Sequence, residues 1–141
     1  MQDAFLDTSI HIAILRREFQ SFEVDDLTGG GDLWLSAVVL EELYAGANER
    51  TRKEVASLEK QFALRSRIVV PELDDWIQAG DVLARLAAKY DYEEIGRGRL
   101  TNDALIAMSA ARLDIRVITA NASDFRRLAE FRSFRWQIAR A

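Results

Sequence analysis

The sequence contains no cysteine, which excludes disulfide bonds, thiolate zinc sites and a cysteine nucleophile. Its only histidine is His11, so a histidine-based metal site or a Ser-His-Asp triad would depend on that one residue. One proline and seven glycines in 141 residues leave little room for linkers. No uncharged apolar run approaches the roughly 20 residues of a membrane span. Any chemistry is therefore expected from carboxylates, hydroxyls, amides and arginine.

Basic residues are in the minority, with 19 Lys and Arg against 23 Asp and Glu, a net charge of −4. The resulting pI of about 5.1 does not indicate a nucleic-acid-binding protein. An acidic site that binds a divalent cation can nevertheless attract an anion, because the cation reverses the local field. Most of the basic residues are arginine, which suits bidentate contacts with phosphate, although the base composition of the genome explains this bias equally well.

The N-terminal segment has no basic region, and Asp3 and Asp7 interrupt its short apolar run. These features do not fit a signal peptide, so the expected location is the cytoplasm. The length suits one domain covering residues 1–141, and a composition that is 49% hydrophobic and 30% charged is typical of a soluble globular protein.

Strands and helices are predicted to alternate along the chain. Short β-branched or apolar runs predict strands, and apolar residues at helical spacing predict helices between them. Strands are expected at 4–6, 33–36, 68–70, 117–119 and 134–138, and helices at about 9–19, 37–47, 51–64, 75–90 and 101–113, with a loop at 91–99. This alternation indicates a mainly parallel sheet with helices on both faces.

Helix starts are predicted from residues that commonly act as N-caps. Thr8 or Ser9 would begin the first helix, Asp74 or Asp75 the helix after Pro71, and Thr101 or Asn102 the helix before residues 117–119. The buried stripe of the helix after Pro71 is predicted to consist of Trp76, Gly80, Leu83, Ala87 and Tyr90.

Acidic residues recur at the ends of the predicted strands and on the following helices. Asp7 and Asp124 come just after strands, Asp103 is near the start of a helix, and Glu41 and Glu42 lie on the helix at 37–47. Each has an ordinary alternative role as a helix cap, a first-turn acid or a solvated side chain. In parallel sheets, however, ligands bind at the carboxyl ends of the strands. Together the acids favour a site for Mg²⁺ or Mn²⁺.

Such a site would suit the hydrolysis of phosphodiesters. A bound cation polarises a phosphoryl oxygen and lowers the pKa of a bound water, and a free carboxylate can accept the proton. Thr119 and Asn121 would orient the water or a carboxylate, or serve as ordinary turn residues. Arg97 and Arg99 would contact phosphates, although a solvated loop is their commoner role.

Four segments resemble, in order, the motifs of the PIN domain family. They are residues 5–9 (FLDTS), 36–46 (SAVVLEELYAG), 102–107 (NDALIA) and 119–125 (TANASDF). Each motif alone is weak, but the ordered set covers nearly the whole chain. Length and motif set are most similar to the VapC-type toxins of toxin–antitoxin pairs.

The resemblance implies a three-layer α/β/α PIN-like fold with a mainly parallel sheet of about five strands, and a Mg²⁺- or Mn²⁺-dependent endoribonuclease. The metal-binding and catalytic acids that it implies are Asp7, Glu42, Asp103 and Asp124, with Thr8, Thr119 and Asn121 in supporting positions. It favours Glu42 over Glu41 because Glu42 directly precedes Leu43. The implied partners are an RNA substrate, a second copy of the chain and a small antitoxin that fills the groove beside the acids.

Three alternatives compete with this interpretation. A phosphatase of the haloacid dehalogenase type needs a second Asp two residues after the first, where this chain has Ser9. A phosphoacceptor receiver domain needs a Lys beyond a late strand, and the last Lys here is Lys89. Neither fits. The remaining alternative is a PIN-like domain that binds RNA or protein without cleaving it.

Overall fold

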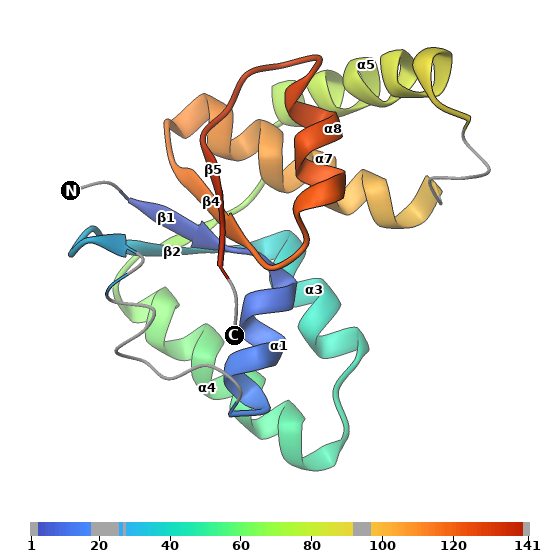
Figure 1. Cartoon of the computed structure of the whole chain (residues 1–141). Coiled ribbons are helices and arrows are strands. Elements are labelled where there is room, and N and C mark those ends of the chain that lie inside the picture. Colours follow the sequence, from blue (N-terminus) through green and yellow to red (C-terminus); the bar gives the residue numbers. More distant parts are fainter. Residues whose placement is uncertain (1–2, 18–25, 27, 92–96, 140–141) are drawn as a thin grey trace.

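The computed structural model describes residues 3–17, 26, 28–91 and 97–139. The elements are β1 (Ala4–Leu6), α1 (Thr8–Leu15), β2 (Leu33–Ser36), α3 (Ala37–Ala45), α4 (Glu49–Leu64), β3 (Ile68–Val69), α5 (Leu73–Lys89), α7 (Arg97–Leu113), β4 (Arg116–Thr119), α8 (Ala122–Ala129) and β5 (Trp136–Ile138). Figure 1 shows α5, α7 and α8 on one side of the sheet and α1, α3 and α4 on the other. Within the described residues, no helix is long and apolar enough to cross a membrane.

One five-stranded sheet with the order β3-β2-β1-β4-β5 forms the centre of the molecule. All four neighbouring pairs are parallel, with Phe5 opposite Trp34 on one side and Val117 on the other. The predicted α/β fold with a parallel sheet of about five strands is confirmed. The edge strand predicted near the C-terminus is also confirmed, as β5.

Side chains of the central strands alternate between two cores, as the period of a strand requires. Phe5 and Val117 lie in the large core with α5 and α7. Ala4, Leu6 and Ile118 lie in a smaller core with Ile10 and Ala13 of α1. Both faces of β1 and β4 are therefore buried, which explains why these strands are short uninterrupted apolar runs in the sequence.

The order of the strands creates a switch point beside β1. After β1 the chain builds outwards through β2 and β3, and it then returns to place β4 on the opposite side of β1. The connections that follow β1 and β4 consequently leave the sheet in different directions, and the carboxyl ends of strands at such a switch point are where ligands commonly bind in α/β sheets. Asp7 follows β1 directly, and Ala120 and Asn121 follow β4.

Helices α1 and α5 begin at Thr8 and Leu73, slightly before the predicted residues 9 and 75. The N-cap of α1 is Asp7 in place of Thr8 or Ser9, which confirms the alternative role of Asp7 as a helix cap, and its side chain accepts a hydrogen bond from the Ile10 amide. Glu72 is the N-cap of α5, and Asp75 accepts a hydrogen bond from the Glu72 amide as the third residue of a capping box. Helix α1 begins earlier because the Asp7 carboxylate, upstream of the predicted cap, accepts an amide of the first turn. In α5 the Asp75 amide donates to the backbone carbonyl of Glu72 at 2.9 Å.

The buried face of α5 also differs from the prediction. It consists of Asp75, Ala79, Val82 and Leu86, whereas Trp76 is 54% exposed. The true face is displaced by about one residue from the predicted stripe, because the ion pair of Asp75 with Arg112 of α7 turns Asp75 inwards. Sequence periodicity predicts that Trp76 is buried and Asp75 is exposed. In the structure Asp75 is buried and Trp76 is exposed.

Helix α7 begins at Arg97, so Thr101 and Asn102 are not its caps and residues 97–99 are not part of a loop. Leu100 is 1% exposed and belongs to the large core. Burial of Leu100 stabilises the helix beyond its polar, glycine-containing start, whose local preference predicted a loop. Residues 92–96 of the predicted loop lie outside the described residues.

Candidate active site

Asp7 is a buried carboxylate at the carboxyl end of the central strand, with only 5% of its surface exposed. The Ser9 hydroxyl donates to Oδ1 at 2.5 Å, and the Ile10 amide donates to the same oxygen at 3.3 Å. The Thr119 hydroxyl donates to Oδ2 at 2.5 Å. Both oxygens of Asp7 are thus held by donors from two different segments, which fixes the orientation of the carboxylate.

The pKa of Asp7 is raised above its ordinary value. Burial is the main cause, because it removes water from the charged form, and the hydrogen bonds from Ser9, Thr119 and Ile10 offset only part of it. In the described part of the chain, the hydrogen bonds and ion pairs of Asp7 include no Lys or Arg. A cation beside this carboxylate would favour its ionised form.

Thr119 and Ser9 connect the ends of β1 and β4. Each hydroxyl has one proton, which it gives to Asp7, and each oxygen accepts a backbone amide. Thr119 Oγ1 accepts the Asn121 amide at 2.9 Å, and Ser9 Oγ accepts the Ala120 amide at 3.1 Å. The hydrogen bonds of Thr119 and Ser9 therefore connect the turn after β4 to Asp7 at the switch point.

Glu42 lies on α3, which begins at the end of β2 with Ser36 as its N-cap. It is half-buried, and the Thr8 hydroxyl donates to its Oε1 at 2.8 Å. Glu41 is exposed and lines a separate hollow with Trp76 and Asn102. Of the two adjacent glutamates, Glu42 is the one that the structure connects to the residue next to Asp7.

Asp124 lies in the first turn of α8, and it is half-buried. The Asn121 side-chain amide donates to its Oδ2 at 3.3 Å, and the Ser123 hydroxyl donates to the Asn121 side-chain oxygen at 3.2 Å. Asn121, not Asp124, is the N-cap of this helix. The cap role that would have explained Asp124 without a site is therefore taken by another residue.

Asp103 is half-buried on α7, which contacts both α3 and β4. Because α7 begins at Arg97, Asp103 lies in the second turn and not in the first. The helix dipole, which acts mainly on the first turn, explains an acid here less well than the sequence suggested. Arg97 and Arg99 lie in the first turn of the same helix, and their side chains lie outside the described part of the structure.

The donor chemistry of this edge suits Mg²⁺ or Mn²⁺, since carboxylate oxygens are the ligands that these ions prefer. Within the described residues, no three acidic or histidine side chains come close enough together to hold a metal ion. Hydrogen bonds orient Asp7, Glu42 and Asp124 individually, through Thr119, Thr8 and Asn121. The chemistry of the acids fits a metal, but their spacing does not form a closed ligand set.

Sequence reasoning missed the role of Ser9, which was considered as a helix cap and not as a hydrogen-bond partner of Asp7. Its hydroxyl holds Asp7 and also accepts an amide from the turn after β4, 111 residues away in the chain. A hydroxyl residue two positions after a strand-end acid was a visible signal. Its second contact depends on the pairing of β1 with β4, which the sequence does not specify.

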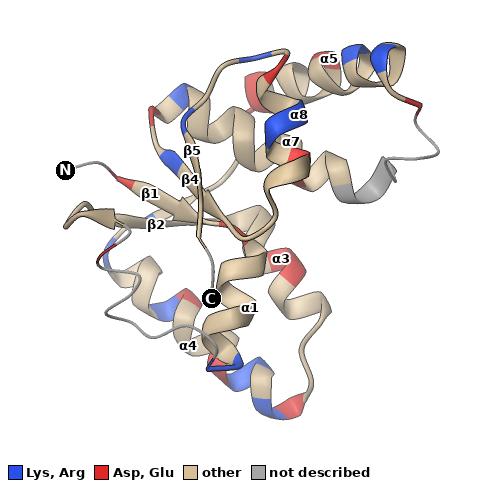
Figure 2. Cartoon of the chain, in the orientation of Figure 1, with Lys and Arg blue, Asp and Glu red and all other residues tan. Residues whose placement is uncertain are grey.

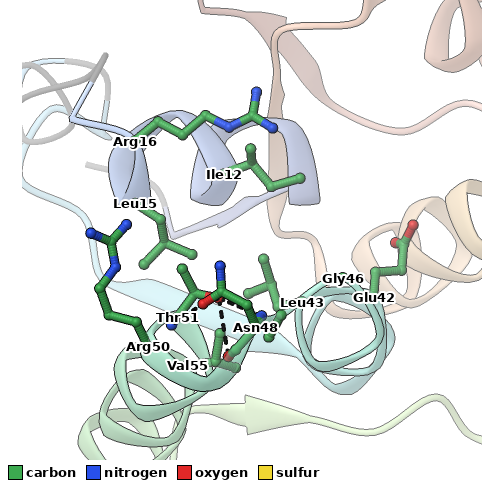
Figure 3. Close-up of a pocket in the computed structure, with 11 residues that line it drawn as sticks. Ile12, Leu15, Arg16, Glu42, Leu43, Gly46, Asn48, Arg50, Thr51 and Val55 are labelled. Atoms are coloured by element: carbon green, nitrogen blue, oxygen red, sulfur yellow. Dashed lines mark hydrogen bonds between the residues drawn. The ribbon is translucent and has the colours of Figure 1, made fainter.

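A groove of about 320 Å³ begins beside Glu42 and runs between α1, α3 and α4. Figure 3 shows Glu42 at one end of the lining residues and Arg16 and Arg50 toward the other. Ile12, Leu15 and Leu43 provide apolar surface between them. Among the candidate acids, Glu42 alone lines this groove, and Figure 3 shows its carboxylate pointing away from the other lining residues.

The fold and these oriented carboxylates define an α/β protein with acidic side chains at the switch point of a parallel sheet. The model of the PIN domain family matches residues 4–131. The chain belongs to the PIN domain family, as the four sequence motifs indicated. A comparison with curated proteins found no match.

Solved structures with the same fold include three toxin–antitoxin complexes. The chain is similar, with a TM-score of 0.71 and 23% identity over 98% of both chains, to a chain of DNA-bound VapBC from Salmonella typhimurium. A DNA-bound VapBC2 from Rickettsia felis gives a TM-score of 0.71 and 20% identity over 99% of this chain and 100% of the other. VapBC-5 from Mycobacterium tuberculosis gives 0.54 and 25% identity over the whole of both chains.

Proposed function

We propose that this chain is a metal-dependent endoribonuclease and the toxin component of a toxin–antitoxin pair. The observation that carries the proposal is Asp7, a buried carboxylate held by two hydroxyls at the switch point without a basic partner in the described residues. Membership of the PIN domain family and the likeness to VapBC complexes support the same function. Burying the Asp7 carboxylate lowers the free energy of unfolding, and a catalytic role would explain why the chain keeps it there.

The residues that would hold Mg²⁺ or Mn²⁺ are Asp7, Glu42, Asp103 and Asp124. When bound, the ion would polarise the scissile phosphate and lower the pKa of a water molecule. The supporting residues have separate tasks: Thr119 fixes Oδ2 of Asp7, Thr8 fixes Oε1 of Glu42 and Asn121 fixes Oδ2 of Asp124. A carboxylate that is free of the ion would accept the proton of the attacking water.

A partner chain is part of the proposal, because three of the similar structures are named as VapBC complexes. An antitoxin segment would fill the groove beside Glu42 and block access to the acids. A homodimer is also proposed. The described surface contains an exposed apolar group at the start of α5, which consists of Val70, Leu73, Trp76 and Ile77 and which a second copy would cover.

The test uses purified protein without a partner and an end-labelled structured RNA. Cleavage is followed with Mg²⁺ or Mn²⁺ and with a chelator, for the wild type and Asp7→Asn. Asparagine also caps helices, so this substitution keeps α1 while removing the charge. Asp74→Asn, an exposed acid on α5, is the matched control. Metal-dependent cleavage by the wild type and the control, with at least a hundredfold loss in Asp7→Asn, is the expected result.

Thermal unfolding distinguishes lost chemistry from a lost fold. In chelator, Asp7→Asn should unfold at the same or a slightly higher temperature than wild type, because burial disfavours the charged carboxylate that it removes. Added Mn²⁺ should raise the unfolding temperature of the wild type more than that of the variant. Cleavage by Asp7→Asn at the wild-type rate would contradict the assignment of this residue.

A second candidate function is favoured by one observation, the absence of a three-acid cluster in the described residues. A PIN domain without a closed ligand set would bind RNA or protein without cleaving it. RNA binding by the wild type without cleavage or Mn²⁺ binding would support this alternative and exclude the nuclease.

A further inference from the structure

An acidic chain that cleaves RNA needs a local basic surface, because its net charge of −4 repels the substrate. Exposed basic side chains gather where α1 ends and α4 begins. They are Arg16 and Arg17 after α1, and Arg50, Arg52 and Lys53 in the first turns of α4. Figure 2 shows these two blue regions close together at the end of the molecule away from α5.

Two hollows bring these residues together. Arg16 and Arg50 line the groove that also contains Glu42, so they face the same channel from α1 and α4. A second hollow of about 520 Å³ is lined by Glu49, Arg50, Arg52 and Lys53. Arg50 lines both hollows. Four cations and two carboxylates line them, and one of these carboxylates, Glu42, lies at the candidate active site.

The cations of this surface are available to a ligand. In the described part of the chain, Arg16, Arg50 and Lys53 make no ion pair, and the Arg52 guanidinium lies over the Tyr44 ring at 5.8 Å. Arginines on the other side of the molecule are engaged differently. Arg112, for example, is paired with Asp75 at 3.0 Å. A phosphate can bind the unpaired guanidiniums without breaking an existing pair.

We propose that Arg16, Arg50, Arg52 and Lys53, called here the basic mouth, bind the phosphodiester backbone of single-stranded RNA and lead it through the groove to Glu42 and Asp7. The inference rests on the proposed ribonuclease function. Guanidiniums match phosphate oxygens in a bidentate geometry. Among the described residues, the linings of both hollows contain no Phe, Tyr or Trp, and the neighbouring Tyr44 ring lies under the Arg52 guanidinium. The basic mouth therefore binds backbone and not sequence.

The first experiment measures RNA binding in chelator, where cleavage does not occur. The full chain, free of partner, is titrated against a labelled single-stranded polyuridine RNA at several salt concentrations. Arg16→Gln/Arg50→Gln should weaken binding about tenfold at low salt and reduce the slope of log affinity against log salt by about 1.4, at roughly 0.7 per phosphate contact.

Arg65→Gln is the matched control for the double variant. Arg65 is exposed at the opposite end of α4 and makes no ion pair with any described residue. Its substitution removes a positive charge far from the basic mouth, so this variant should bind RNA within about twofold of wild type.

A cleavage assay in Mn²⁺ separates this inference from the proposed function. The double variant should show a raised KM and a nearly unchanged kcat, whereas Asp7→Asn should lose kcat and retain RNA affinity. RNA affinity that falls in the double variant while the wild type never cleaves would support the basic mouth and reject the nuclease.

Two results would overturn the basic mouth. One is an equal loss of RNA affinity in Arg65→Gln, and the other is wild-type RNA affinity in the double variant. If the double variant with wild-type RNA affinity also binds a polyglutamate peptide more weakly, this surface is reassigned to an acidic protein segment.

Discussion

At the scale of single residues, hydroxyl groups determine how the carboxylates of the site lie. Thr119 is fully buried, and its only proton goes to Asp7 while its oxygen accepts the Asn121 amide. Thr8, the residue after Asp7, donates its hydroxyl proton to the carboxylate of Glu42. Side chains of this kind resemble ordinary turn residues in a sequence, but here Thr119 donates to a buried carboxylate and Thr8 to a half-buried one.

Thr119→Val should impair both stability and cleavage. It removes the donor to Asp7 and leaves the Asn121 amide without its acceptor, so we expect a loss of about 2 kcal/mol in the free energy of unfolding. Thr119→Ser keeps the hydroxyl and should retain most of the activity. Chemical denaturation and RNA cleavage are measured for both variants. Equal activity of the Val and Ser variants would show that this hydroxyl does not position Asp7.

His11 should make stability depend on pH. It is 4% exposed on α1, its Nε2 has no hydrogen-bond partner among the described residues, and burial lowers its pKa from 6.5 to about 4. The unfolded chain therefore binds a proton at a higher pH than the folded chain. As the pH falls from about 6.5 to about 4, the free energy of unfolding should decrease by about 3 kcal/mol, because each pH unit in this interval costs about 1.36 kcal/mol.

His11→Leu is the variant that tests this dependence. This substitution removes the titrating group, and no hydrogen bond at Nε2 is lost with it. The stability of the variant relative to wild type should therefore increase steadily as the pH falls below about 6.5. Denaturant unfolding at several pH values provides the measurement. The contribution of Asp7, whose raised pKa acts in the opposite direction, is common to both proteins and cancels in the difference. A difference that does not vary with pH would contradict the prediction.

At the scale of elements, a buried ion pair holds the two long helices of one layer together. Asp75 of α5 is 1% exposed and accepts from Arg112 Nε and Nη2 of α7 at 3.0 Å. Asp75 also accepts the Glu72 amide, so one carboxylate caps its own helix and binds the neighbouring one. Burial of this acid determines which face of α5 packs on the core.

Asp75→Asn should destabilise the protein by about 3 kcal/mol, because it leaves the guanidinium of Arg112 without its buried charged partner. Asp74→Asn changes an exposed acid in the same turn and should cost less than about 1 kcal/mol. Urea unfolding compares the two variants. Losses of similar size would mean that the charge of the first turn, and not the pair with Arg112, stabilises this region.

At the scale of the whole molecule, charge and apolar surface are distributed unevenly. The basic mouth lies near the start of α4, while the exposed apolar residues Leu73, Trp76 and Ile77 lie at the start of α5, on the opposite side of the sheet. An acidic protein can thus present a basic surface to one ligand and an apolar surface to another, which its average composition does not reveal.

Trp76→Glu should convert the proposed homodimer into a monomer, because it places a charge in the apolar surface that a second copy would cover. Sedimentation velocity at several concentrations measures the change. Leu64→Glu is the control, since Leu64 is 78% exposed at the end of α4, away from this surface. A wild-type protein that is monomeric at every concentration, or dissociation by Leu64→Glu alone, would contradict the prediction.

The sequence by itself determined the class of fold and the identity of the candidate acids. Short apolar runs at residues 4–6, 33–36 and 117–119 became β1, β2 and β4, because strands buried on both faces leave an uninterrupted apolar signal. Asp7 and Asp124 could be selected because they follow strands, and strand ends are readable from local pattern. The start of α7 and the packed face of α5 were less predictable, since burial of Leu100 and of Asp75 overrode local preference.

Only the tertiary structure decided how these residues are connected. The contacts of Asp7 with Thr119, of Ser9 with Ala120 and of Thr8 with Glu42 span 112, 111 and 34 residues. The groove that joins Glu42 to Arg16 and Arg50 likewise requires α1, α3 and α4 to meet. Such contacts depend on strand order and helix packing, which arise from the whole chain and leave no local pattern.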